Sequence, residues 1–174
     1  MTKDVIEAIL ERRSIRRFKD EEVPAATVGR LLDAARWAPS AGNIQPWKIA
    51  VVYSKDKKQE LAAAAFGQQF VAQAPVVFVV CALPEKSAAR YGDRGRNLYA
   101  IQDTAAMVQN IMLAAAGYGL GTCWVGAFDE KAVSETLGLA FDHRPVAIIP
   151  IGYPGGEVKA PARSSVDDIV VLYE

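Results

Sequence analysis

The chain has 174 residues, a length that predicts a single domain over residues 1–174, and 51% of them are hydrophobic, enough for a buried core. Its 20 basic and 20 acidic side chains balance, which argues against nucleic-acid binding, because such proteins carry a basic excess. No apolar segment has the length of a membrane span or the form of a secretion signal, so we expect a cytoplasmic protein that does not bind membranes.

The chain is predicted to begin with two helices separated by a basic segment. Residues 4–11 form the first helix, capped by Thr2 or Asp4. Residues 24–38 form the second, opened by Pro24 and stopped by Pro39. Spacing by three and four residues gives each helix an apolar face: Val5, Ile6, Ile9 and Leu10 in the first, and Val28, Leu31, Leu32 and Ala35 in the second.

The middle of the chain alternates strand and helix patterns. Strands are predicted at 47–53 and 76–82, the latter apolar throughout and so covered on both faces. Helices are predicted at 55–65 and 68–73, and the strongest one at 100–116 has an apolar face wide enough to be shared with another subunit. Residues 83–97 are polar and lack a clear period, which favours a mobile loop or lid.

The last third contains a strand at 122–125, a helix from Asp129 to residue 137, and a strand at 145–151. After it, residues 153–174 form a predicted C-terminal arm: a stretch rich in proline and glycine, then the apolar run 169–173. That run resembles a strand and needs a sheet edge to join, which a second subunit could supply.

The basic segment between the first two helices is a candidate anion site. Arg12, Arg13, Arg16 and Arg17 flank Ser14 within six residues. Arginine suits a phosphate because its planar fork makes paired, charge-assisted hydrogen bonds. The alternative is structural, because cations at the end of a helix interact favourably with its dipole.

A second candidate is the loop at 39–47, which joins small residues to two amides and ends in Pro46-Trp47. The side chains of Asn43 and Gln45 both donate and accept, as the edge of a heterocycle requires, and Gly42 allows close backbone approach. The same residue types also make ordinary turns, so composition alone leaves both interpretations open.

The remaining sequence features give weaker evidence for a functional site. The glycines at 117, 119 and 121 follow a helix instead of a strand, so they indicate a helix end and not a dinucleotide fingerprint. The single histidine, His143, and the buried-looking Cys81 and Cys123 form no metal-ligand pattern. We therefore predict no metal site and no catalytic side chain, which points to chemistry done by a bound cofactor.

Four segments in order carry a resemblance to a known family: RRSIRRF at 12–18, PSAGNIQPW at 39–47, GLGTCWVGAF at 119–128 and IPIGYP at 149–154. Together they resemble the FMN-dependent nitroreductase superfamily. The resemblance implies an α+β fold with a mixed central sheet flanked by helices. It also implies an intertwined homodimer with C-terminal strand exchange, and two tightly bound FMN molecules at the subunit interface.

The resemblance also implies which residues bind FMN. Arg12, Ser14 and Arg16 correspond to phosphate, ribityl and pyrimidine contacts, Arg13 contributes mainly backbone, and Arg163 in the arm is a further phosphate ligand. The remaining expected contacts are Gln69, the loop residues Pro39, Ser40, Ala41 and Asn43 from the partner subunit, and Val125, Gly126 and Ala127 beside the flavin ring.

The function that this resemblance implies is reduction of nitroaromatic or quinone-type acceptors with NADH or NADPH by ping-pong hydride transfer. Two alternatives stay open at this point. One is a specialised flavin enzyme of the same fold, such as a dehalogenase, a dehydrogenase or a flavin-fragmenting enzyme. The other is a flavin-binding carrier or sensor without turnover.

Overall fold

The structure is a computed structural model that describes residues 3–173. Its centre is a four-stranded sheet in the order β1-β2-β4-β3, with β1 at Trp47–Val52, β2 at Val76–Ala82, β3 at Gly121–Thr122 and β4 at Arg144–Gly152. All three pairings are antiparallel, and a single parallel bridge joins Ser14 to Thr122. The predicted α+β class is confirmed, and the sheet is mixed only through that bridge.

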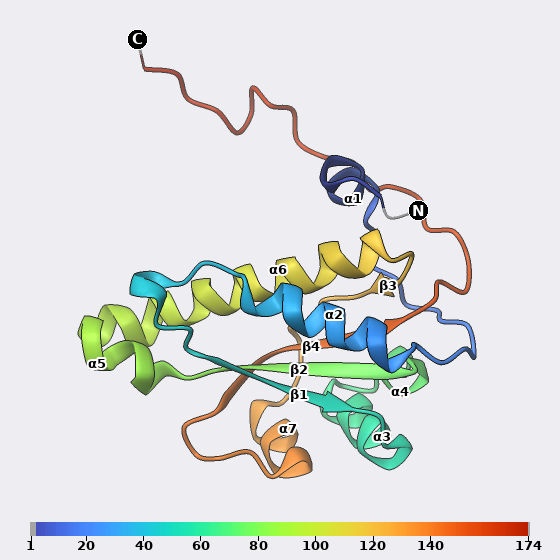
Figure 1. The fold of residues 1–174 in the computed structure, drawn as a ribbon, viewed down its shortest axis with the longest axis horizontal. Coiled ribbons are helices and arrows are strands. Elements are labelled where there is room, and N and C mark those ends of the chain that lie inside the picture. The colour runs from blue at the N-terminus through green and yellow to red at the C-terminus, as the bar shows by residue number, and fades with distance from the viewer. Residues whose placement is uncertain (1–2, 174) are drawn as a thin grey trace.

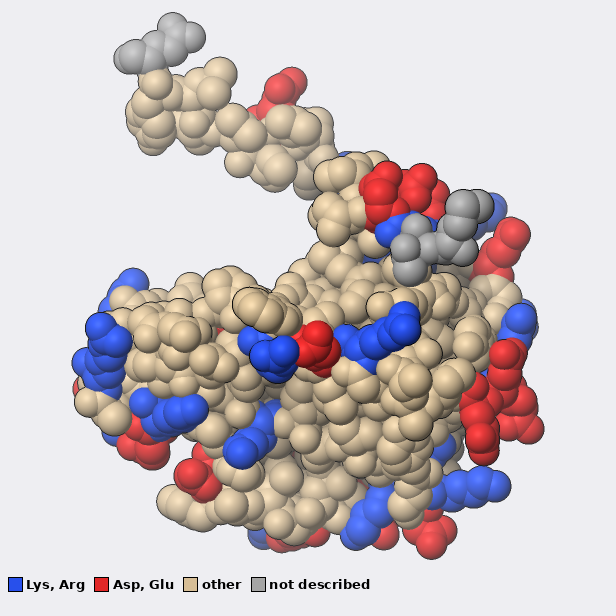
Figure 2. Space-filling view, viewed as in Figure 1, with Lys and Arg blue, Asp and Glu red and all other residues tan. Residues whose placement is uncertain are grey.

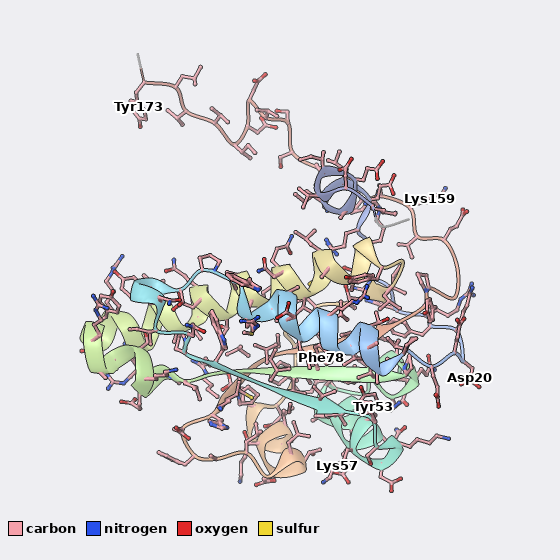
Figure 3. All side chains as sticks on the ribbon, viewed as in Figure 1. Asp20, Tyr53, Lys57, Phe78, Lys159 and Tyr173 are labelled. Atoms are coloured by element: carbon pink, nitrogen blue, oxygen red, sulfur yellow. The ribbon has the colours of Figure 1, made fainter. Side chains whose placement is uncertain are left out.

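Helices cover both faces of the sheet (Figure 1). On one face lie α2 (Ala25–Arg36) and α6 (Ala100–Gly117); on the other lie α3 (Lys55–Ala64), α4 (Phe70–Gln73) and α7 (Glu130–Leu137). Strand side chains alternate between faces, so the buried strand β2 sends Val76, Phe78 and Val80 to one layer and Val77, Val79 and Cys81 to the other. Phe78 lies at the centre of the molecule (Figure 3).

Most predicted boundaries agree with the structure within a few residues. Asp4 and Asp129 cap α1 (Val5–Glu11) and α7 through hydrogen bonds from backbone N–H groups in the first turn, as predicted. The other proposed cap, Thr2, lies outside the described residues. Helix α6 ends where Gly119 takes a φ of 72°, a conformation that glycine adopts without steric cost. The predicted strand at 122–125 is shorter, since after Thr122 only Val125 pairs with β4.

The prediction of a loop at 83–97 was wrong. Residues Pro84–Arg94 form helix α5, and a π-helical turn, η2 (Gly95–Tyr99), leads into α6. The chain reverses at Gly92, whose φ is 55°, and this break hides the helical period from a sequence pattern. The two pieces pack closely, because a Cβ on Gly95 would lie 2.5 Å from the carbonyl oxygen of Ser87.

Two apolar surfaces remain uncovered. The predicted apolar face of α1 is exposed, with Val5, Ile6 and Leu10 each more than 60% accessible, and only Ala8 of this helix is buried. The arm leaves the body of the molecule after β4 (Figures 1 and 3), and its apolar residues from Val166 to Tyr173 are exposed. The strand expected at 169–173 does not form in the single chain, where this segment stands away from the sheet.

Among residues 3–173, no helix is both long enough and apolar enough to cross a membrane.

Candidate functional site

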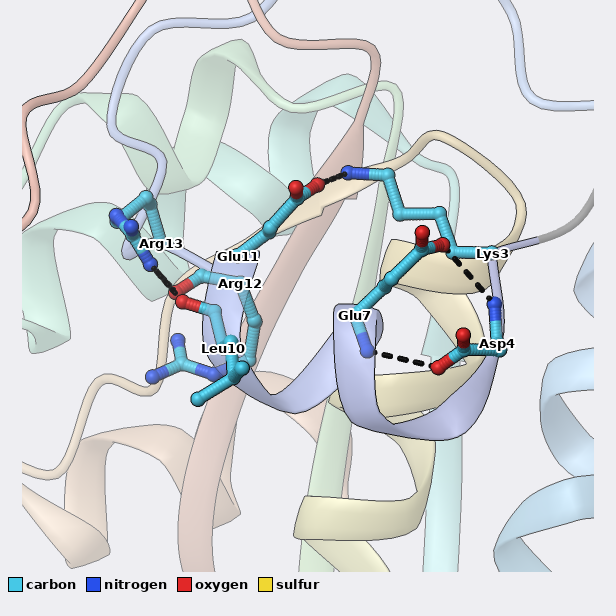
Figure 4. Close-up of polar contacts among 7 residues, drawn as sticks. All are labelled: Lys3, Asp4, Glu7, Leu10, Glu11, Arg12 and Arg13. Carbon is cyan, nitrogen blue, oxygen red and sulfur yellow. Dashed lines mark hydrogen bonds and ion pairs between the residues drawn. The ribbon is translucent and has the colours of Figure 1, made fainter.

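The basic segment begins where α1 ends. The guanidinium of Arg13 donates to the carbonyl oxygens of Leu10 and Arg12, at 2.7 and 2.9 Å (Figure 4). These carbonyls belong to the last turn of the helix and its cap, which have no intrahelical donors. The structural alternative weighed from the sequence therefore applies to Arg13, whose side chain caps a helix.

Arg12 is different. It occupies the C-cap position of α1, and its Nη1 atom is buried without a hydrogen-bond partner in the described part of the chain. A buried guanidinium N–H without an acceptor is costly, and a bound anion would remove that cost. Beside it lies a cavity of about 210 Å³ that is also lined by Arg13, by Ala116 of α6, and by Glu11, whose carboxylate is paired with Lys3. The residues present therefore fit an anionic group here.

Ser14 and Arg16 are held in place by the edge of the sheet. The N–H of Ile15 donates to the carbonyl oxygen of Thr122 at 2.8 Å, and Ser14 forms the parallel bridge to the same residue. Ser14 and Arg16 both face the thiol of Cys123. Burial raises the pKa of this thiol, and the positive charge of Arg16 acts in the opposite direction with a smaller effect. The exposed Arg16 guanidinium also lies over the ring of Phe70, 5.9 Å from its centroid.

The segment after Cys123 lies on the same side of the sheet as α3 and α7. Val125 exchanges two hydrogen bonds with Ile148, both at 3.0 Å, and this fixes the backbone that follows. Gly126 and Ala127 are exposed, and the carbonyl oxygen of Ala127 accepts from the side chain of Gln68 at 3.2 Å. Gly126 has open space around it, since a Cβ there would come no closer than 3.8 Å to any neighbour.

Gln68 contacts the 125–127 segment, and the sequence analysis named its neighbour Gln69 instead. The structure places Gln69 on the surface, where its side-chain oxygen accepts from Gln59 at 3.3 Å. Adjacent glutamines at the start of a short helix point in different directions, and the pattern gives no sign of which one faces the 125–127 segment.

The loop at 39–43 is ordered by local and distant hydrogen bonds. The hydroxyl of Ser40 accepts from the N–H of Gln45 at 3.0 Å, and the N–H of Ala41 donates to Oδ1 of Asp103 at 3.1 Å. Asn43 takes a φ of 55°, in the left-handed region that asparagine tolerates, and both Asn43 and Pro39 are exposed. The loop therefore presents a shaped, polar surface to its surroundings.

Asp103 contacts the 39–43 loop and is the second residue that the sequence analysis did not identify. It is buried on α6, its Oδ2 atom has no partner among the described residues, and burial raises its pKa. An acid among the apolar positions of a helix, beside Ala100 and Thr104, is the signal that could have identified it.

A single chain does not bring the two candidate sites together. The 39–43 loop contacts Asp103 in the first turn of α6, whereas Arg12 lies beside Ala116 in its last turn. Thirteen residues of helix separate these positions, which corresponds to about 20 Å at 1.5 Å per residue. Figure 1 shows the loop and α1 at opposite ends of α6.

Arg163 lies in the exposed arm and pairs with no acidic side chain in the described part of the chain. A cavity of about 740 Å³ lies elsewhere, between residues 19–25 and α3, and none of the predicted site residues lines it. Within residues 3–173, no cluster of three or more His, Cys, Asp or Glu side chains could hold a metal ion.

Comparisons with known proteins agree on one family. The family model described as the nitroreductase family matches residues 9–71 and 63–153, which include every candidate site residue except Arg163. A protein of Thermus thermophilus called an NADH dehydrogenase is 32% identical, over 97% of this chain and 95% of its own length.

Two further relatives carry more specific names. An oxygen-insensitive NADPH nitroreductase of Salmonella typhimurium is 32% identical over 86% of this chain and 65% of its own length. The solved structure of the NADPH:FMN oxidoreductase from Vibrio harveyi complexed with NAD+ superimposes on this chain with a TM-score of 0.90. It covers 99% of this chain and 78% of that one at 27% identity.

Proposed function

Since the chain belongs to the nitroreductase family, we propose that it is an FMN-dependent oxidoreductase that uses NADH or NADPH to reduce nitroaromatic or quinone-type acceptors. The observation that carries this proposal is the unpartnered, buried Nη1 of Arg12 beside Ser14 and Arg16. It is an anion site on a protein whose relatives are named for FMN and nicotinamide nucleotides.

In this proposal Arg12 and Arg163 bind the FMN phosphate, Ser14 the ribityl chain and Arg16 the pyrimidine. The backbone of Arg13 borders the phosphate while its side chain caps α1. Val125, Gly126 and Ala127 lie beside the flavin ring, where the exposed backbone of Gly126 leaves room for a flat group. Gln69, with its neighbour Gln68, completes the polar side of the site.

The site is shared between two subunits in this proposal. The loop residues Pro39, Ser40, Ala41 and Asn43 lie about 20 Å along α6 from Arg12 of the same chain, so they contact the flavin of the partner. The exposed apolar face of α1 and the arm over 153–174, which is exposed at 156–173, are then covered in a homodimer, where the arm's apolar end joins the partner's sheet.

Bound FMN supplies the hydride chemistry, accepting from NAD(P)H and donating to the acceptor, which gives ping-pong kinetics. The protein holds and polarises the bound FMN. Arg16 places a positive charge at the pyrimidine edge, where reduction adds electron density. The open space at Gly126 and the exposed Pro39 and Asn43 would keep bound FMN accessible to each substrate in turn.

Purified protein tests this directly. The protein should be yellow, with the visible absorbance of an oxidised flavin, and anaerobic NADH or NADPH should bleach this colour. Adding a quinone or a nitroaromatic compound should restore the colour, and initial rates at varied concentrations of both substrates should give parallel double-reciprocal lines. Protein that stays colourless with added FMN, or flavin that neither nucleotide reduces, would refute the proposal.

A further inference from the structure

The helical hairpin formed by α5 and η2 carries positive charge that has no acidic partner. Its two acidic side chains, Glu85 and Asp93, are both held by Arg96, at 2.7 to 2.8 Å. The hydrogen bond from Arg96 lowers the pKa of Glu85, so that carboxylate stays ionised and bound to Arg96.

Three cations of the same hairpin remain: Lys86, Arg90 and Arg94. None of them lies within 4.0 Å of a carboxylate oxygen in the described residues. Figure 2 shows Lys and Arg side chains gathered at the end of the molecule where Figure 1 places α5. We call these three residues the α5 cations.

The α5 cations are positioned by neutral contacts. Arg90 lies over the ring of Tyr91 at 5.4 Å from its centroid; Arg94 lies over Tyr99 at 5.3 Å and donates to its hydroxyl at 2.9 Å. The two tyrosines contact each other edge to face, with centroids 5.2 Å apart. Stacking on aromatic rings restrains a long side chain without neutralising it, which lowers the entropic cost of binding an anion.

These residues adjoin the loop that the proposed function places at the partner's flavin. Lys86 donates to the carbonyl oxygen of Gln45 at 3.0 Å. A Cβ on Gly42 would lie 2.5 Å from the hydroxyl of Tyr91 and 2.7 Å from Nη1 of Arg90. A substrate on the flavin beside this loop therefore meets restrained positive charge.

We propose that the α5 cations bind the phosphate monoester of NADPH and give the enzyme a preference for NADPH over NADH. This inference rests on the proposed function, because it assumes that the loop and its hairpin face the partner's flavin. NADPH carries a phosphate monoester that NADH lacks, and guanidinium groups bind such a group through paired, charge-assisted hydrogen bonds.

The test is the double variant Arg90→Gln with Arg94→Gln, assayed with NADPH and with NADH against one quinone. We expect kcat/KM for NADPH to fall roughly tenfold to hundredfold and that for NADH to change by less than about threefold. Arg144→Gln is the matched control: it removes a cation that is paired with Glu130 at 2.9 Å, and it should leave the nucleotide preference unchanged.

Binding gives a readout that does not depend on turnover. Adenosine 2′,5′-bisphosphate should bind the wild type in calorimetry more weakly as salt rises, and the double variant should lose most of this affinity. Equal losses with both nucleotides, or unchanged values for both, would overturn the proposal.

A carboxylate group on the electron acceptor is also an anion that the α5 cations can bind. A second pair of assays distinguishes this carboxylate from the phosphate of NADPH. If the double variant slows reduction of a nitrobenzoate but not of the neutral nitrobenzamide, while NADPH and NADH are unaffected, the nucleotide assignment is wrong. Failure of the proposed function itself looks different, because the wild type would then show no flavin and no oxidation of either nucleotide.

Discussion

The buried carboxylate of Asp103 accepts a hydrogen bond from the backbone N–H of Ala41, at 3.1 Å, and this bond joins the first turn of α6 to the 39–43 loop. Sixty-two residues separate the two partners in the chain. The contact matters because the loop is the part of the chain proposed to reach the flavin of the partner subunit.

Asp103→Ala should therefore weaken the loop and the fold together. It leaves the N–H of Ala41 without its acceptor, which costs about 1–3 kcal/mol of unfolding free energy. Asp103→Asn keeps an acceptor oxygen for the N–H of Ala41, so it should lose less stability than Asp103→Ala. Urea unfolding of the three proteins, with KM for NADPH as a second measure, checks both expectations.

The same carboxyl group predicts a pH dependence. Burial raises the pKa of Asp103, so the folded protein holds this proton more firmly than the unfolded chain does. Its ionisation therefore lowers stability as the pH rises from about 4, the unfolded value, through the raised folded value. The stability of Asp103→Asn relative to the wild type should therefore be higher at pH 7 than at pH 4. An equal difference at both values would contradict this assignment.

Arg12→Gln should release FMN. The substitution removes a charged donor from the proposed phosphate site, and one such bond is worth about 1.5–3 kcal/mol, so FMN should bind roughly tenfold to hundredfold more weakly. Arg163→Glu should have a similar or larger effect because it reverses a charge. Fluorescence titration of the apoprotein with FMN measures both, with Arg144→Gln as the control. Unchanged occupancy in Arg163→Glu would count against the role of the arm.

Gly121→Ala should disturb the basic segment through packing. The added Cβ would lie 2.5 Å from Cγ1 of Ile15, between Ser14 and Arg16, so the segment has to move. We expect a loss of about 1–3 kcal/mol in unfolding free energy and weaker FMN binding. Gly29→Ala on α2, where the new Cβ meets nothing within 4 Å, should be neutral or slightly stabilising.

Neither cysteine should react in the native protein. Burial raises the pKa of Cys81 to about 11 and also raises that of Cys123, so both are protonated thiols at pH 8. Titration with a chromogenic disulfide reagent should detect no fast-reacting thiol before unfolding and two afterwards. A thiol that reacts within seconds in the native state, and disappears in Cys123→Ser, would show that Arg16 ionises Cys123.

Removal of residues 157–174 should convert the protein to a monomer. The deletion takes away the exposed apolar end of the arm, from Val166 to Tyr173, which the homodimer is proposed to bury. Light scattering coupled to gel filtration gives the mass directly. Lys159→Gln changes the arm but leaves its apolar end intact and should stay dimeric. A dimeric deletion variant would show that the arm is not what joins the subunits.

Some features of this protein follow from the sequence alone. The apolar run at 76–82 correctly predicted a strand covered on both faces, and Asp129 correctly predicted the cap of the helix that follows it, because both signals act over a few neighbouring residues. The motifs at 12–18, 39–47, 119–128 and 149–154 likewise identified the family without coordinates.

The tertiary structure decided what depends on distant partners. The helical hairpin at 83–99 was not recognised in the sequence because Gly92 interrupts its helical period. The role of the buried Asp103 becomes visible only in the tertiary structure, through its hydrogen bond with Ala41, far away in the chain. The apolar face of α1 was recognised correctly as a pattern, yet the single chain leaves it exposed. Periodicity tells which side chains favour burial, but the surface that buries them is fixed by the packing of whole elements, within a chain or between two.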